Sequence, residues 1–191
     1  MAAASEYSRL FQRRARIVRG LWIAVLLLLV LIADGLIFAT NPLHVPEGNL
    51  PARMLGLQLF QELDPSMEPT FPEKTSLLVS AWPYWHADPK PGDIVAFTYP
   101  PDHSQADVKR VIAVAGSTVE IRNSAVLVDG KLIDEPYLHG VIPNWNVPRS
   151  MGRITVPADK FFVMGDNRDK SEDSRRWGAI SRESIIGKFW F

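Results

Sequence analysis

The chain has 191 residues, with 21 basic and 21 acidic side chains and a formal net charge of zero. This length fits one domain of ordinary size and a short additional segment. There is no cysteine, which excludes disulfides, thiolate catalysis and cysteine-ligated metal. Residues 41–191 carry a net charge of −3, so we expect no nucleic-acid partner, because such a partner requires a basic surface.

The first predicted element is an apolar helix near the N-terminus. From Leu21 to Ala33 the chain reads "LWIAVLLLLVLIA", and the apolar stretch resumes after Asp34 up to Ala39. As a helix these residues span roughly 28 Å, close to the hydrocarbon thickness of a bilayer. We therefore expect a transmembrane anchor at residues 20–40. The alternative is a cleavable signal peptide, which also places an apolar core after basic residues.

The charges before this helix predict its orientation. Residues 1–19 contain five arginines and one glutamate, a net charge of +4. Basic residues remain on the cytoplasmic side of a membrane. We expect residues 1–19 in the cytoplasm, the helix as a single pass through the plasma (inner) membrane, and the rest of the chain outside the cytoplasm.

The remaining chain has the pattern of a β protein. Residues 41–53 are punctuated by Pro and Gly and are expected to be a linker. Asp129-Gly130, between two apolar runs, is a strong hairpin signal. No stretch after residue 50 has an apolar period of 3.6 over the length of a helix. We expect residues 54–191 to be mainly β, in a closed or partly closed antiparallel assembly. The expected strand segments are 76–82, 93–99, 108–116, 117–123, 125–133, 153–157, 160–165 and 184–191.

The stretch "LDPSMEPTF", Leu63 to Phe71, places Ser66 in a run that cannot lie inside a helix. Pro69 lacks an amide donor, and the residue before each proline is pushed toward extended geometry. Ser66 is therefore held in a rigid, irregular segment. Such a serine is either part of a surface turn or a presented nucleophile, and a nucleophile needs a base elsewhere.

A lysine is the candidate base. His44, His86, His103 and His139 belong to no polar motif and are expected in loops, and no residues have the spacing of a metal site. Lys109 lies in the apolar run "DVKRVIAVAG", where alternation alone does not decide its direction. It either faces water at a sheet edge or is buried as a neutral amine that can take the proton of Ser66.

A third stretch, "MGDNRDKSEDSRRWG" at 164–178, combines four acids and four bases with Ser171 and Ser174. It is interpreted as a support of the site or as a charged surface turn. Together, "PSMEPTF", "GDIVAF", "VKRVIAVAG" and this stretch, in this order after an apolar segment, resemble the motif boxes of the bacterial type I signal peptidases. The resemblance covers the chain from about Phe60 to the C-terminus.

The resemblance implies a membrane-anchored Ser/Lys endopeptidase with an antiparallel β catalytic module and one transmembrane helix. Such an enzyme cleaves signal peptides from exported preproteins, after small residues one and three before the cut. Its partners would be signal peptides and membrane lipid, and it would need no cofactor or metal. Exposed aromatic side chains could rest the domain on the lipid interface. The candidates for this contact are Phe60, Met67, Phe71, Trp82, Trp85 and Trp177.

Carried over to this chain, the resemblance makes Ser66 the nucleophile and Lys109 the general base. Ser171 would orient the lysine through its hydroxyl. Phe60, in a strand that binds the substrate, and Met67 would line the substrate pocket. The supporting ion pairs would be Asp166 with Arg110 and Asp173 with Arg175.

Three positions depart from the family pattern, and one of them is the stretch "VAGS" at 114–117, where the family usually has Pro-Gly-Asp. Asp64 stands where Ser or Thr often assists the oxyanion, and a carboxylate aimed at an oxyanion would repel it. We expect Asp64 to point away and leave the backbone amide of Ser66 as the main donor. Asp107, two residues before Lys109, is an acid where the family often has an aromatic residue.

Other functions are compatible with parts of this pattern. A specialised peptidase for a narrow client set, such as pilins or a conjugation system, would share all of these motifs. An inactive membrane-anchored β-module that binds exported proteins would need the fold but not both Ser66 and Lys109. A self-cleaving repressor of the DNA-damage response would need a DNA-binding domain where this chain has an apolar segment.

Overall fold

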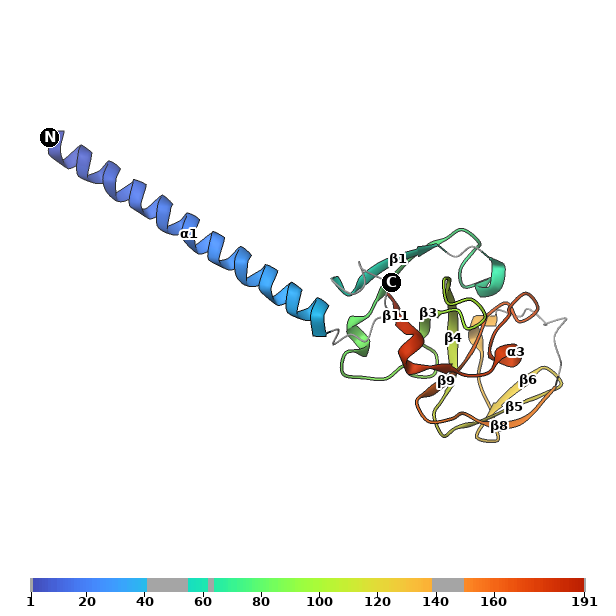
Figure 1. Cartoon of the computed structure of the whole chain (residues 1–191). Helices are drawn as coiled ribbons and strands as arrows, with labels where there is room; N and C mark the ends of the chain where they lie inside the picture. The colour runs from blue at the N-terminus through green and yellow to red at the C-terminus, as the bar shows by residue number, and fades with distance from the viewer. Residues whose placement is uncertain (1, 41–54, 62–63, 139–149, 191) are drawn as a thin grey trace. The chain divides into compact units, whose positions relative to one another are not determined.

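A computed structural model describes residues 2–40, 55–61, 64–138 and 150–190 (Figure 1). The chain divides into two compact units, residues 1–40 and residues 41–191. The predicted linker at 41–53 lies outside the described residues, as do His44 and His139.

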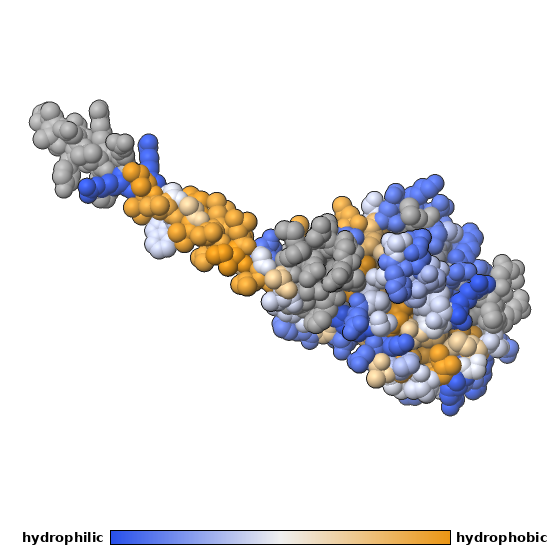
Figure 2. Space-filling model, viewed as in Figure 1, coloured by the Kyte–Doolittle hydropathy of each residue, from blue (hydrophilic) through white to orange (hydrophobic). Residues whose placement is uncertain are grey.

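The first unit is a single helix, α1 (Ala2–Thr40). Its stretch Arg16–Leu36 has a mean hydropathy of 2.4 and is long and apolar enough to cross a membrane. Figure 2 shows apolar side chains along this part of the helix. None of this stretch is buried by other residues. A helix that is apolar around its circumference is suited to lipid, because water does not solvate such a surface.

The second unit is built around a large antiparallel sheet, as expected. In the described residues this sheet has the strand order β1-β2-β11-β3-β4-β9-β10, so β1 is an edge strand and β4 lies in the interior. The strands are β1 (Leu57–Gln61), β2 (Ser76–Ser80), β3 (Ile94–Thr98), β4 (Ala106–Val114), β9 (Lys160–Met164), β10 (Ile180–Ser181) and β11 (Ile185–Trp190).

A smaller antiparallel sheet is inserted between β4 and β9 in the chain. Its order is β7-β6-β5-β8, and its strands are β5 (Thr118–Arg122), β6 (Ala125–Val128), β7 (Lys131–Leu132) and β8 (Met151–Thr155). Asp129 and Gly130 have φ of 52° and 76° and connect β6 to β7, which confirms the predicted hairpin. In Figure 1 this sheet and β1 lie at opposite ends of the second unit.

Short helical turns connect some of these strands. In the described residues the 3₁₀ turns are η1 (Pro65–Met67), η2 (Trp82–Tyr84), η3 (Pro136–Leu138) and η4 (Arg182–Ser184), the last of which precedes β11. The segment of Ser66, expected to be irregular, forms η1, because one 3₁₀ turn tolerates proline at its start. The helix α3 (Ser174–Trp177) has four residues, consistent with the absence of a long helical period.

The core explains the position of β4. Val108, Val111, Ile112 and Ala113 of this strand are all buried, and together they contact three apolar clusters of the unit. Burial of each large aliphatic side chain contributes about 1.5–3 kcal/mol. Strand β4 is therefore held by packing within all three clusters, so a polar side chain on this strand is placed rigidly.

The aromatic residues expected at the surface are divided by the structure. Trp82 and Trp85 are exposed, with 41% and 40% of their surface accessible, and their rings are in edge-to-face contact. Met67 and Phe71 are buried in the cluster with Leu77, which corrects their assignment to a lipid contact. These two side chains gain more from the protein core, where every face of an apolar group is covered.

Candidate active site

Ser66 is placed by the turn η1. Its amide donates to the side chain of Asp64 at 2.7 Å, and its carbonyl accepts from the amide of Asn167 at 2.8 Å. Met67, directly after it, is fully buried in the core. The segment around Ser66 is therefore fixed from three directions, and the serine is itself 1% exposed.

Lys109 lies in β4 and is buried, which decides between the two directions that the sequence left open. Its register partner is Val95 of β3, and its surface is 1% exposed. The Nζ atom is 2.9 Å from Ser66 Oγ and 3.1 Å from the carbonyl oxygen of Val108. It also bonds to the carboxylate of Asp107. The structure thus brings Ser66 and Lys109 into hydrogen-bond contact.

The orientation of Asp64 differs from the expectation. Asp64 does not point away, because its carboxylate caps η1 and accepts from the amide of Ser66. An aspartate before a helical turn commonly takes this position, since it satisfies an amide that has no partner inside the turn. The amide expected to serve as the main oxyanion donor is therefore bonded to a carboxylate in this structure.

The position of Ser171 also differs from the expectation. Its hydroxyl is buried, but it has no hydrogen-bond partner among the described residues, and the lysine nitrogen bonds elsewhere. Asp107 holds the nitrogen instead. A carboxylate is a stronger acceptor for an amine or ammonium than a neutral hydroxyl is, so the acid at this position replaces the serine as the partner of the lysine.

The expected ion pair between Arg110 and Asp166 is present. Arg110 Nε and its terminal nitrogen donate to the two carboxylate oxygens at 2.8 and 2.7 Å. Thr70, four residues after Ser66, also donates to this carboxylate. Because Arg110 follows Lys109 in β4, the pair connects the lysine strand to the loop at 165–178 and to the segment of Ser66.

The expected pair of Asp173 and Arg175 closes the same loop. Arg175 donates to both carboxylate oxygens of Asp173 at 2.7 Å, and Asp173 caps α3. Asp173 also accepts from the amide of Gly165 at 3.1 Å. Removal of one partner of such a buried pair costs about 3–5 kcal/mol, because the other charge remains unpaired.

A network that the sequence reasoning missed lies beside this loop. Arg168 is 2% exposed and bonds to Glu135, while its Nε donates to the carbonyl of Gly165 at 3.1 Å. The guanidinium of Arg110 stacks on the ring of Tyr137 at 4.1 Å. Burial raises the pKa of the Tyr137 hydroxyl, and the neighbouring Glu135 adds to this effect. Only the density of charge at 164–178 pointed to such partners.

A groove lies beside the dyad, between the edge strand β1 and the start of β4. Its lining residues are Phe60, Gln61, Asp64, Tyr99, Gln105, Ala106, Asp107, Val108, Lys170 and Glu172. Phe60, for which a substrate contact is predicted, is one of these lining residues. Met67 is not among the lining residues, because it is fully buried in the cluster on which Phe60 packs. It supports the groove from within the core.

The acids that line this groove set its electrostatics. Burial raises the pKa of the Asp107 carboxyl above its ordinary value, and the charge of Asp64 adds to the rise while Lys109 opposes it. The pKa of Tyr99 is also raised, by desolvation and by its hydrogen bond to Glu172. Burial thus disfavours the charged form of the Asp107 carboxyl, and Lys109 beside it favours that form.

Comparison with known proteins identifies the family. The sequence profile described as signal peptidase, peptidase S26, matches residues 17–191. The probable signal peptidase I-1 of Synechocystis sp. is 36% identical over 170 residues, which cover 79% of this chain and 84% of that protein. The signal peptidase I of Leptolyngbya laminosa is 36% identical over 137 residues, 65% of this chain and 64% of that protein.

Similar values are found in other bacteria. The signal peptidase I of Bacillus amyloliquefaciens is 36% identical over 134 residues, which cover 66% of this chain and 71% of that protein. A solved structure of a signal peptidase I from Enterococcus faecalis V583 has 33% identity and a TM-score of 0.47, with 53% of this chain and 97% of that chain covered. The profile match across most of the sequence, in agreement with the motif order, shows that this chain belongs to the S26 family of signal peptidases.

Proposed function

We propose that Ser66 and Lys109 are the catalytic dyad with which this signal peptidase cleaves signal peptides from exported preproteins. The observation that supports the proposal most directly is the distance of 2.9 Å between Lys109 Nζ and Ser66 Oγ, two groups that are both 1% exposed. A nucleophile and a base within hydrogen-bond reach, shielded from water, are the requirement for activating a serine without a histidine.

The reaction would proceed through an acyl-enzyme. The neutral amine of Lys109 takes the proton of Ser66 while the serine oxygen attacks the carbonyl carbon of the scissile bond. The tetrahedral intermediate collapses when the Lys109 ammonium gives this proton to the leaving amine of the mature protein. Lys109 then deprotonates a water molecule, which hydrolyses the ester and frees Ser66.

The groove beside the dyad is proposed to bind the signal peptide in extended form. Strand β1 is at the edge of the large sheet, so its unpaired backbone groups can add a further strand. Phe60 of β1 and Val108 of β4 both line this groove, and Phe60 packs against the apolar cluster that contains Val108. Side chains on the bound peptide would meet these apolar walls close to Ser66, which favours small residues before the cut.

Substitution of the dyad tests the mechanism. We predict that Ser66→Ala and Lys109→Ala each lower kcat by about 10⁴-fold or more, as removal of a nucleophile or base does in other serine hydrolases. Lys109→Arg should be equally inactive, because a guanidinium remains charged and cannot accept the proton. Cleavage of a signal-sequence precursor by the detergent-solubilised full chain measures this.

A matched control is Lys160→Ala, which removes an exposed lysine of β9 and should leave the rate unchanged. Full activity of Lys109→Ala would exclude the lysine as base, and full activity of Ser66→Ala would exclude the serine as nucleophile.

The substrate prediction concerns the residues before the cut. A precursor whose signal ends in Ala-x-Ala should be cleaved, and the same precursor with Phe-x-Phe should not, because large side chains overlap the walls of a tight cleft. We expect a ratio of kcat/KM of about 10²-fold or more, from single-turnover cleavage of both precursors. Equal cleavage would contradict the role of the groove but not that of the dyad. A panel of precursors in the same assay separates a broad from a narrow client set.

A further inference from the structure

We propose that Asp107 is a positioning residue of the dyad, which holds the amine of Lys109 so that the nitrogen lone pair faces Ser66. The inference rests on the proposed dyad and adds a third member to it. The family resemblance implies the orienting role for Ser171, but the Ser171 hydroxyl makes no hydrogen bond within the described part of the chain.

The geometry around Lys109 Nζ supports this role. Its three polar neighbours are Ser66 Oγ at 2.9 Å, the Val108 carbonyl at 3.1 Å and the Asp107 carboxylate. A neutral amine has two N–H groups and one lone pair. Asp107 and the Val108 carbonyl accept the two N–H groups, since both are pure acceptors when the acid is ionised. The remaining position on nitrogen is the lone pair, and it faces the hydroxyl that must lose its proton.

Asp107 is itself held in place. Residues 107 and 109 are two apart in β4, so their side chains lie on the same face of the sheet. The amide of Val108 donates to the Asp107 carboxylate at 2.7 Å. The side chain is only 15% exposed. A fixed acceptor can restrict the rotation of the lysine amine, whereas a mobile one cannot.

Asp107 also faces the charge that forms on Lys109 during the reaction. Once Lys109 has taken the proton of Ser66, its ammonium lies against the Asp107 carboxylate, as the imidazolium does against aspartate in a Ser-His-Asp triad. The carboxylate therefore stabilises the charged lysine in the reaction. Burial raises the pKa of the Asp107 carboxyl, and the adjacent Lys109 opposes this rise by favouring the ionised acid.

Other charged groups face the same space. Asp64 comes from the start of η1, and Tyr99, from the end of β3, is hydrogen-bonded to Glu172 of the loop at 165–178. Lys170 of that loop also lines the groove. The charge of Arg110 is paired with the carboxylate of Asp166. Of these groups and Asp107, only Asp107 has a hydrogen bond to the lysine nitrogen in the described residues.

The test is the pH profile of kcat/KM for the full chain in detergent, with a signal-sequence precursor as substrate. Asp107→Asn keeps the size of the side chain and an acceptor oxygen but removes the charge. We expect the ascending limb of the profile to move to lower pH by about one unit or more, because an opposite charge at contact distance shifts a titration by about 1–3 units. The plateau kcat should fall, since the ammonium formed in the reaction loses its partner.

Two further variants separate charge from shape. Asp107→Leu removes both acceptor and charge and should lower kcat at least about tenfold with little change in KM, a larger loss than in Ser171→Ala. Asp107→Glu retains the charge and should keep the limb near its wild-type position. If Asp107→Asn does not fold, the comparison of Asp107→Glu with Asp107→Gln gives the same contrast.

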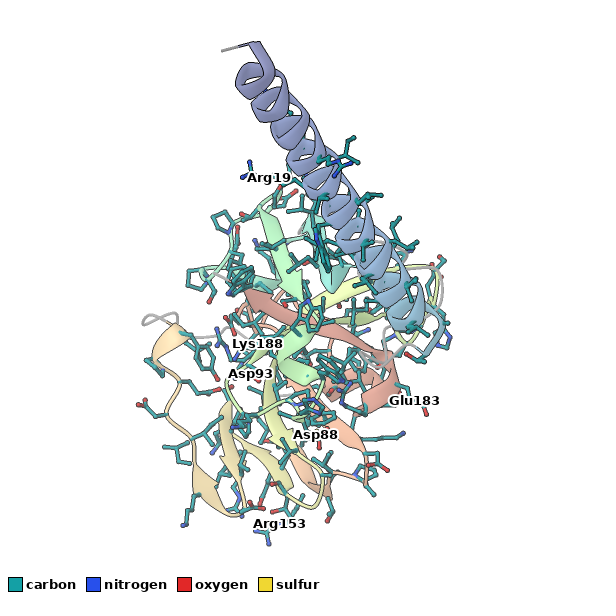
Figure 3. The ribbon with its side chains drawn as sticks, turned by 90° about the vertical axis from the view of Figure 1, so that its left-hand side faces the viewer. Arg19, Asp88, Asp93, Arg153, Glu183 and Lys188 are labelled. Carbon is teal, nitrogen blue, oxygen red and sulfur yellow. The ribbon has the colours of Figure 1, made fainter. Side chains whose placement is uncertain are left out.

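The matched control is Asp93→Asn. Asp93, directly before β3, bonds to Lys188 of β11 at 2.7 Å and its side chain is 14% exposed; the two lie side by side in Figure 3 and form a second Asp–Lys pair whose carboxylate is similarly buried. Its loss should lower the melting temperature without moving the limb. A wild-type profile for Asp107→Asn would overturn the role of Asp107. Activity in Ser66→Ala or Lys109→Ala would instead overturn the dyad, so the two failures are distinguishable.

Discussion

The carboxylate of Asp64 accepts the hydrogen bond of the Ser66 amide, a donor that an oxyanion would need. The carboxylate of Asp64 is 2.7 Å from the amide nitrogen of Ser66. In Asp64→Ser the hydroxyl can still cap η1, because serine is a good residue at that position. It can also donate to an oxyanion. One oxyanion donor is worth about 10²–10³ in kcat, so we expect kcat to rise by about tenfold or more in a precursor-cleavage assay.

The control for this prediction is Asp64→Ala. It frees the amide of Ser66 without supplying a hydroxyl, so we expect a smaller gain in kcat and a loss of about 0.5–2 kcal/mol in stability. A lower kcat in Asp64→Ser than in the wild type would show that the carboxylate contributes to the reaction.

At this scale the sequence supports the identity of Ser66 and Lys109 as candidates but not the arrangement of their neighbours. The order of the motifs pointed to both residues, and the structure brings them together. The directions of Asp64 and Ser171 were not predictable in this way. In each case more than one acceptor is close to the same donor. Differences of a few tenths of an ångström in distance then decide which hydrogen bond forms.

Among the elements, the loop at 165–178 is pressed directly against the segment of Ser66 at Gly165. A Cβ added to Gly165 would lie 2.3 Å from Ser171 Oγ and 2.6 Å from the carbonyl oxygen of Ser66. Gly165→Ala must therefore displace the nucleophile or the loop. We predict a loss of about 1–3 kcal/mol in stability, as for other overpacked sites. We also predict a fall in kcat of about 10²-fold, since a small misplacement of a reacting group has that effect.

The control is Gly152→Ala in β8. No heavy atom lies within 4 Å of a Cβ built at Gly152, and it is exposed. This variant should keep both the melting temperature and the rate. Thermal unfolding and precursor cleavage are measured on the same samples, and wild-type values for Gly165→Ala would mean that the loop yields without moving Ser66.

The elements themselves were predicted to different degrees. The hairpin at Asp129-Gly130 was predicted, because both the apolar alternation and the turn residues are local signals. The direction of Lys109 was not. Strand β4 shifts register against β9 between Val111 and Ala113. A bulge of this kind breaks the alternation on which a sequence argument depends. The network of Arg168 with Glu135 joins residues 33 apart and has no local pattern.

At the scale of the whole molecule, an apolar helix and a peptidase unit in one chain suit a substrate that lies at a membrane. A signal peptide is itself an apolar segment, so the bond to be cut lies close to a bilayer. The stretch Arg16–Leu36 is apolar enough to cross such a bilayer. Trp82 and Trp85 remain exposed on the second unit, and tryptophan prefers the interface between lipid and water. The orientation of the chain across the membrane is a prediction that follows from the arginines of residues 1–19.

The absence of cysteine makes this orientation directly measurable. We predict that Lys131→Cys, at an exposed site of β7, reacts with a membrane-impermeant maleimide in right-side-out vesicles. Ser8→Cys, before the arginine cluster, should react only after permeabilisation, because basic residues stay on the cytoplasmic side. The mass of each membrane-bound variant separates the two readings of the apolar helix. A chain of full mass shows a retained anchor, whereas a chain that has lost its N-terminal residues shows a cleaved signal peptide. Labelling of Ser8→Cys in sealed vesicles would contradict the predicted orientation. It would place the dyad on the cytoplasmic side, where preproteins have not yet been exported.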